Sequence, residues 1–202
     1  MPDVKKAELI EGEVHMPSPV SHSYHGGPHL DAAVWLGTYR ASTPGIDAGD
    51  NSTVRLDLDS EPQPDGMLFT TPDHGGRVVI DDDGYLNGAP ELIVEVSASR
   101  ASIDLGKRLN VYLRNQVLEY VVWRVYDEAV DWFVLRAGAF APLVPDPVDG
   151  FFKSEVFPGL WLAPDALVHR DLGTVLAALA RGLASPEHAA FVAQLAARRQ
   201  TP

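Results

Sequence analysis

The feature that most limits how this chain can fold is a carboxylate inside an apolar run. Residues 90–96 read PELIVEV, and a short run rich in β-branched residues is typical of a buried strand. Glu95 stands inside this run, where an unpaired charge would be costly to bury. We therefore predict that Glu95 either pairs with a basic side chain or holds a divalent metal ion.

The amino-acid composition excludes several kinds of functional site. The chain has 202 residues, 46% of them hydrophobic and 22% charged, as expected for one globular domain. It has no cysteine, which excludes disulfides, thiolate metal sites and cysteine nucleophiles. The net charge of −12 repels phosphate backbones, so contact with nucleic acid requires a local basic patch, such as the arginines and lysine between Arg100 and Arg114.

The sequence has neither a membrane-spanning run nor a signal peptide at its start, so we expect a cytoplasmic protein with no membrane contact.

Hydrophobic periodicity predicts an α+β fold, with a central mixed β-sheet, flanking helices, an N-terminal hairpin and C-terminal helices. After the strand that contains Glu95 we expect a helix capped by Ser99 or Ser102, with a buried stripe of Leu105, Leu109, Tyr112 and Leu113. Other helices are predicted at 29–39, at 164–183 and from Pro186 onward. The predicted strands and hairpins are 8–14, 53–59, 67–71, 77–80, 90–99, 118–126, 130–136, 140–145 and 154–162.

Four charged positions can form one site if the strands lie in this order. Asp65 precedes an apolar strand, Glu95 lies in the next core strand, and Asp104 and Lys107 are three residues apart on the following helix. Two carboxylates are the hard oxygen ligands that Mg²⁺ prefers, and Mn²⁺ is expected to substitute for it. A cation beside them can stabilise charge that develops on a phosphate.

The same stretches resemble the Uma family, described as restriction endonucleases of the PD-(D/E)XK nuclease superfamily. The resemblance rests on Pro64-Asp65, then PELIVEVSAS, DLGKRLNVYLRNQVLEYVVWRV and EVFPGLWL, in that order. The start of the chain is also similar, with ELIEGEV followed by the histidine-containing loop MPSPVSHSYH. The resemblance covers residues 8–167 and implies a restriction-endonuclease-like core.

The resemblance also implies an activity and a set of site residues. It implies a homodimeric Mg²⁺-dependent endonuclease that hydrolyses DNA phosphodiester bonds, with Asp65 and Glu95 as catalytic metal ligands. The superfamily has a lysine two positions after the glutamate, where this chain has Ser97, so the catalytic lysine is assigned to Lys107 on the helix, with Asp104 in support. The chain also has Ser97-Ala98-Ser99 in place of the family's Leu-Ser-Pro-Ser. We expect residues 1–170 to form the nuclease domain and residues 171–202 a C-terminal helical extension packed on it or trailing from it.

Further supporting residues are Glu13, then Glu8, and His25. The family has glutamates near the first two positions, and His25 or His22 matches a histidine near the family's first helix. The spacing of His15, His22, His25 and His29 fits no zinc motif, which favours an ordinary loop. Ordinary roles stay open for the main candidates as well: Asp65 could be a turn residue, and Lys107 an exposed helix lysine. The alternative function is a catalytically inactive nuclease-fold module for binding or dimerisation.

Overall fold

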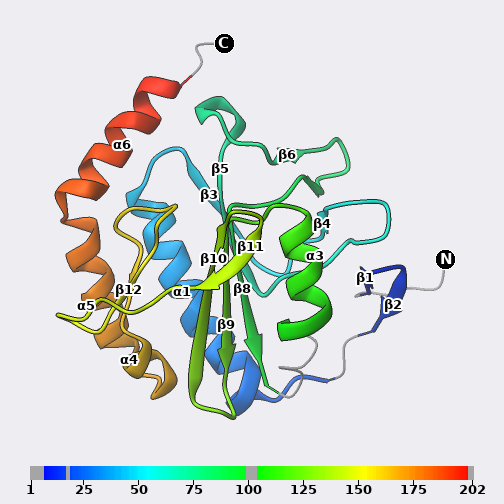
Figure 1. Cartoon of the computed structure of the whole chain (residues 1–202), viewed down its shortest axis with the longest axis horizontal. Coiled ribbons are helices and arrows are strands. Elements are labelled where there is room, and N and C mark those ends of the chain that lie inside the picture. Colours follow the sequence, from blue (N-terminus) through cyan, green and yellow to red (C-terminus); the bar gives the residue numbers. More distant parts are fainter. Residues whose placement is uncertain (1–6, 17–18, 99–103, 200–202) are drawn as a thin grey trace.

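A six-stranded mixed β-sheet forms the centre of the protein in the computed structural model, which describes residues 7–16, 19–98 and 104–199. The strand order is β11-β10-β9-β8-β5-β3 (Figure 1). Strands β8 and β9 are parallel, and the other neighbours are antiparallel. The strands are β3 (Ile46–Gly49), β5 (Gly66–Thr70), β8 (Leu92–Ser97), β9 (Glu119–Arg124), β10 (Ala129–Arg136) and β11 (Ala139–Pro142).

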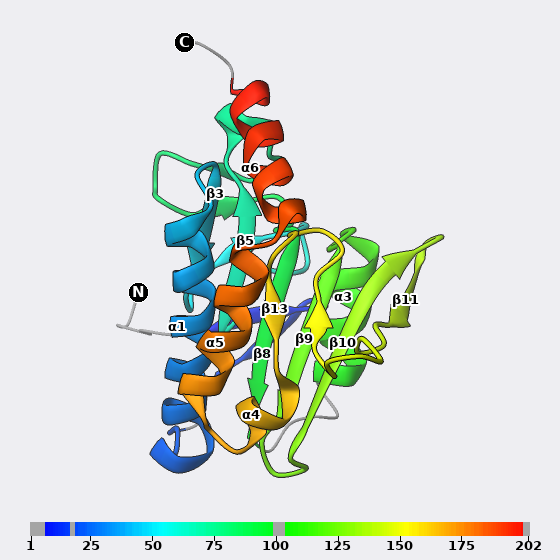
Figure 2. The same cartoon turned by 90° about the vertical axis from the view of Figure 1, so that its left-hand side faces the viewer.

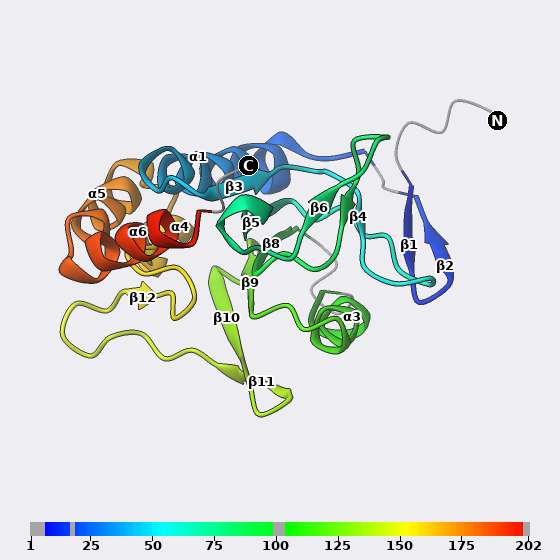
Figure 3. The same ribbon diagram turned by 90° about the horizontal axis from the view of Figure 1, so that it is seen from above.

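Helices cover both faces of this sheet, as the view from above shows (Figure 3). On one face lie α1 (Gly27–Ser42), α4 (Pro164–Val168), α5 (Leu172–Leu183) and α6 (Pro186–Arg198). On the other lie η3 (Asp104–Arg108) and α3 (Leu109–Arg114). Strand β8 is therefore buried on both faces, which explains why its sequence is almost continuously apolar.

The two faces of β8 belong to two hydrophobic clusters. Val94 and Val96 pack in the cluster that includes α1 and α5, while Ile93 packs in the cluster that includes Val111 and Tyr112 of α3. Successive side chains of a strand alternate between faces, so Glu95 shares the α3 face with Ile93.

Three small sheets and two short helical turns complete the fold. The N-terminal hairpin turns at Glu11 and Gly12, which both have positive φ, and its strand β1 lies on the same side of the sheet as α3. The remaining elements are β1 (Glu8–Ile10), β2 (Glu13–His15), η1 (His22–Gly26), β4 (Val54–Arg55), η2 (Pro72–His74), β6 (Val79–Ile80), β7 (Leu86–Asn87), β12 (Phe152–Lys153) and β13 (Trp161–Leu162).

The α+β prediction is confirmed, and several boundaries are wrong. The strand predicted over 53–59 shrinks to β4, and the one predicted over 154–162 is replaced by β12 and β13, which lie at or beyond its ends. The helix predicted over 164–183 breaks between α4 and α5, because Arg170 has a positive φ of 59° and the side chain of Asp171 caps α5 through the N–H of Thr174. The caps predicted at Ser99 and Ser102 lie outside the described residues.

The C-terminal helices pack against the side of the molecule that carries α1 (Figure 2). Val175 and Leu179 of α5 and Leu195 of α6 are buried in the same cluster as Val94. The division of the chain at residue 170 stays a prediction. Among the described residues, no helix is both long and apolar enough to span a lipid bilayer.

Candidate active site

Asp65 and Glu95 come from neighbouring strands of the central sheet. Strands β5 and β8 run antiparallel, with Gly66 opposite Val94 and Met67 opposite Ile93. Asp65 directly precedes β5 and Glu95 follows Val94 in β8, so both residues lie one position beyond the paired Gly66 and Val94. The hydrogen bond from the N–H of Val96 to Oδ2 of Asp65 sets this carboxylate beside the residue that follows Glu95.

Asp65 is buried and held from two sides. Its Oδ2 accepts a hydrogen bond of 2.8 Å from the N–H of Val96, and its Oδ1 lies 3.3 Å from Nε2 of His25. The Nδ1 of His25 lies 2.9 Å from the carbonyl oxygen of Val96, so both ring nitrogens face acceptors, a geometry that suits a proton on each. Burial raises the pKa of Asp65, but the hydrogen bond and charge of His25 and the Val96 N–H outweigh burial and hold this pKa below its ordinary value.

Glu95 is 3% exposed and pairs with a guanidinium group. Nη1 of Arg108 lies 2.5 Å from Oε1 of Glu95, and the hydroxyl of Tyr112 donates to the same oxygen at 2.7 Å. Burial, followed by the charge of Glu95, raises the pKa of Tyr112 well above its ordinary value, so this hydroxyl stays a donor. The basic neighbour expected for a carboxylate in a core strand is therefore Arg108.

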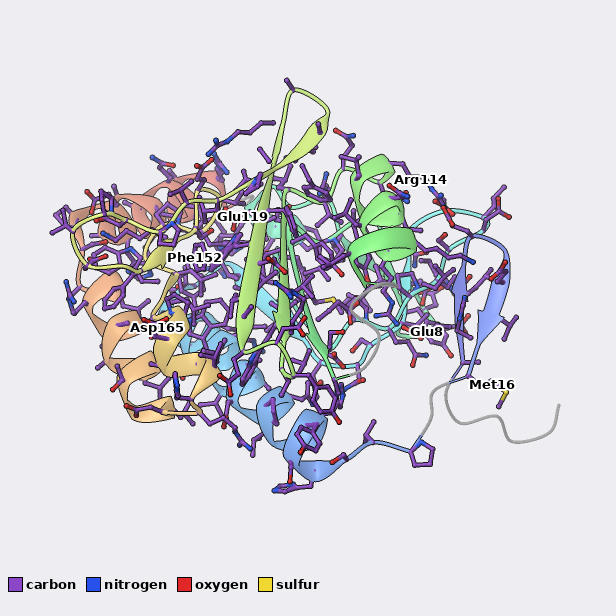
Figure 4. The ribbon with its side chains drawn as sticks, turned by 60° about the horizontal axis from the view of Figure 1, so that its bottom comes forward. Glu8, Met16, Arg114, Glu119, Phe152 and Asp165 are labelled. Carbon is purple, nitrogen blue, oxygen red and sulfur yellow. The ribbon has the colours of Figure 1, made fainter. Side chains whose placement is uncertain are left out.

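A second buried carboxylate shares the same guanidinium. Nη2 of Arg108 donates to Oε2 of Glu8 at 2.6 Å, and Oε1 of Glu8 accepts from the N–H of Gln63 at 2.8 Å. Glu8 lies between β1 and α3 (Figure 4). Arg108 thus links the N-terminal hairpin, the central strand and the helix in one buried network, which we call the Arg108 network: Glu8, Glu95, Arg108 and Tyr112.

Lys107 points elsewhere. Its ammonium donates to Oε2 of Glu13 on β2 at 2.6 Å, and the Lys107 and Glu13 side chains are 42% and 63% exposed. This contact raises the pKa of Lys107 and lowers that of Glu13. Of the supporting residues predicted from sequence, the structure thus brings His25 to Asp65 and Glu8 to the Arg108 network, while Glu13 lies at the surface with Lys107. Asp104 opens η3, and its side chain is not among those described.

Sequence reasoning missed Arg108 and treated Tyr112 as core. A signal was present, because Arg108 precedes Tyr112 by four positions, and residues at i and i+4 lie on one face of a helix. Tyr112 belonged to the predicted buried stripe, so the basic residue on that face was Arg108. Lys107, one position away, projects about 100° around the helix axis.

The donor chemistry fits a magnesium ion with few protein ligands. Mg²⁺ is typically bound through one or two carboxylates, with water and substrate phosphate completing its shell, and Asp65 with Glu95 supplies two. Over the residues with described side chains, no group of three or more His, Asp or Glu residues could hold a metal ion. Asp65 and Glu95 would hold such an ion, and Arg108 and Tyr112 contact Oε1 of Glu95.

Comparison with known proteins identifies the family of this chain. The family model Uma2, described as "Putative restriction endonuclease", matches residues 1–165. The chain belongs to the Uma2 family. The matched range contains every site residue discussed above and ends within α4.

Structural comparison supports the fold of this Uma2 member. One similar solved structure is entitled a putative nuclease belonging to DUF820 from Anabaena variabilis ATCC 29413. It superposes with a TM-score of 0.58 at 15% sequence identity, covering 81% of this chain and 89% of the other. At that identity the likeness shows the fold alone. No curated protein matches the chain.

Proposed function

We propose that this protein is a metal-dependent nuclease that hydrolyses phosphodiester bonds of DNA, with Asp65 and Glu95 as the ligands of Mg²⁺. The observation that carries this proposal is the placement of two buried carboxylates at the same end of the neighbouring segments β5 and β8, with Arg108 beside Glu95. Family membership supports a nucleic acid as the substrate. The homodimer stays a prediction drawn from the sequence resemblance.

The roles of the chain's own residues follow from their contacts. The N–H of Val96 and the ring of His25 orient Asp65, and Tyr112 orients Glu95. A guanidinium presents planar paired donors that suit a phosphate as well as a carboxylate, so we assign Arg108 as the cation that faces the scissile phosphate. Bound Mg²⁺ would supply Lewis acidity and lower the pKa of a coordinated water. Lys107, to which the sequence assigned the role now given to Arg108, is proposed to act only through its contact with Glu13.

A cleavage assay tests this proposal. Plasmid and single-stranded DNA are incubated with the purified protein in Mg²⁺ or Mn²⁺, and with Asp65→Asn and Glu95→Gln. Removing one ligand is expected to lower cleavage roughly a thousandfold, since metal catalysis supplies several kcal/mol and each 1.4 kcal/mol is about tenfold. The matched control is Glu119→Gln, which neutralises a buried glutamate at the opposite end of the neighbouring strand and should leave the cleavage rate near that of wild type. Metal-dependent cleavage that survives Glu95→Gln would overturn the assignment.

The second candidate is an inactive nuclease-fold binding module. It is favoured by the ion pair with Arg108, which already balances the charge of the buried Glu95. Thermal melting with added Mn²⁺ separates the two functions, because a ligand that binds the folded state raises the melting temperature. A rise that Glu95→Ala abolishes supports the nuclease. No rise in wild type, together with no cleavage, supports the module.

A further inference from the structure

Two exposed tyrosines stack on each other although they come from distant parts of the chain. Tyr24 lies in η1, and Tyr126 follows β9 in the turn that leads to β10. Their ring centroids are 4.5 Å apart with an interplanar angle of 27°, and the residues are 45% and 59% exposed. Each ring covers one face of the other, so the exposed surface of the pair consists of outer ring faces and edges.

The pair stands at the same end of the sheet as the candidate active site. Tyr24 directly precedes His25, whose ring contacts Asp65. On the other side, the N–H of Val125 donates to the carbonyl of Ser97, two residues beyond Glu95. Figures 1 and 2 both show the start of α1 and the β9–β10 turn at the same end of the molecule.

Core packing does not account for this pair. The large aromatic residues of the core, such as Trp35, Trp123 and Tyr120, are at most 1% exposed, whereas the Tyr24–Tyr126 pair leaves much of its apolar surface in water. Exposed aromatic rings beside a site are a common way of holding an unstacked base, because every base has a π-face. Stacking also suits this chain in particular: its net charge of −12 opposes phosphate binding at long range, while stacking depends little on charge.

We propose that the outer faces of Tyr24 and Tyr126 stack an unpaired nucleobase of the strand that is cut, so the substrate is single-stranded or locally unpaired nucleic acid. This inference rests on the proposed function for the phosphodiester that lies next to that base. In an intact duplex the faces of each base are covered by its neighbours, so such a base must first leave the stack before it can reach the tyrosines.

Binding can be measured without cleavage. A single-stranded oligonucleotide of about 12 nucleotides, within the length that such sites cover, carries the fluorescent base 2-aminopurine and is titrated with protein in the presence of a chelator. Wild type should bind it more tightly than the matching duplex and quench its fluorescence through stacking. Tyr24→Ala and Tyr126→Ala should each weaken binding by about 5- to 150-fold, the range that one stacked base contributes. The loss should be the same at low and high salt, because neither substitution changes charge.

Two further variants make the result specific. Tyr85→Ala removes a tyrosine that is 41% exposed and lies over Arg55 in the small sheet, and it should bind like wild type. Tyr126→Phe keeps the aromatic ring and should retain binding. Melting temperatures of all variants confirm that they are folded.

The possible results separate this inference from the proposed function. Single-strand binding that depends on both tyrosines, in a protein that cleaves nothing, would support the stacking site and overturn the nuclease. Cleavage that depends on Glu95, with affinity and KM for single strands unchanged in Tyr24→Ala and Tyr126→Ala, would overturn the stacking site and leave the nuclease standing. Tighter binding to the duplex than to the single strand would also overturn it.

Discussion

Two buried glutamates on adjacent parallel strands are stabilised by different kinds of partner. Glu95 lies towards the end of β8, and Glu119 opens β9, opposite Leu92 in the parallel register. Glu95 pairs with the guanidinium of Arg108, whereas the carboxylate of Glu119 accepts from Ser154 Oγ at 2.6 Å and from the N–H groups of Glu155 and Val156 at 2.7 and 3.3 Å. Figure 4 labels Glu119 within the sheet, apart from Glu8.

The two carboxylates differ in whether a positive charge lies beside them. Burial raises the pKa of Glu119 to about 7, because the neutral donors around it only partly offset the loss of water. Glu119 can therefore shed its charge near neutral pH, and its contacts tie β9 to the loop before β13. Glu95 has a full positive charge beside it, so a second cation could compete for that carboxylate. The following predictions test this contrast.

The largest effect on stability is expected from Arg108→Met. It leaves Glu95 and Glu8 buried without their cation, and breaking a buried ion pair in this way costs about 3–5 kcal/mol of unfolding free energy. Urea denaturation measures the loss. Adding Glu95→Gln should recover part of it, because the buried charge that lost its partner is then gone. A double variant less stable than the sum of the two single variants would contradict the pairing of Glu95 with Arg108.

Added metal ions should also distinguish Glu95 from Glu119. If Glu95 is a metal ligand, Mn²⁺ should raise the melting temperature of Arg108→Met by more than that of wild type, because the ion no longer competes with the guanidinium. At about 100 times its dissociation constant, the bound ion adds roughly 2.7 kcal/mol of stability. Glu119→Gln should respond to Mn²⁺ like wild type. An equal response in Arg108→Met and wild type would argue that Arg108 and the metal do not share an oxygen.

The raised pKa of Glu119 predicts how the free energy of unfolding depends on pH. Because its folded pKa lies above the ordinary value of 4.5, its contribution to stability is fully present below about pH 4.5 and is lost as pH rises through about 7. For a pKa raised from 4.5 to about 7, the total loss by pH 8 is about 3 kcal/mol. Glu119→Gln keeps the shape without the charge, so the unfolding free energy of this variant relative to wild type should improve by about 2.5 kcal/mol from pH 5 to pH 8. Parallel stability profiles of the two proteins over this range would contradict a raised pKa for Glu119.

Local patterns in the sequence predicted the scaffold well. The alternation of β9 and β10, the apolar run of β8 and the Glu-Gly turn of the hairpin are signals that depend on near neighbours, and the structure has these elements. The order of Asp65 and Glu95 on adjacent strands was also predictable, because both positions precede or lie within strong strand patterns. The other residues of the candidate site were not predictable in this way.

The sequence could not predict which residues of this helix face the core, because that depends on where the helical turns begin. Arg108 and Lys107 are neighbours in sequence, and a difference of one position turns a side chain from the core to the surface. The start of that helix is an η3 turn of the π type, in which each turn contains more residues than in an α-helix, so the spacing from Asp104 does not carry over to α3. The stacking of Tyr24 on Tyr126 has no sequence signal at all, since it depends on two loops brought together by the sheet.

The smallest effect is expected from Lys107→Met. Its contact with Glu13 is exposed on both sides, and exposed ion pairs add little because water and salt screen them. The melting temperature should match that of wild type within error, and the cleavage rate should fall far less than in Arg108→Met, provided that both variants are assayed well below their melting temperatures. Glu13→Gln, which removes the partner from the other side, is the matched control and should behave in the same way. If Lys107→Met instead loses cleavage as completely as Glu95→Gln while Glu13→Gln does not, then Lys107 leaves Glu13 to reach the phosphate, and the cation at the reaction is the one on the outer face of the helix.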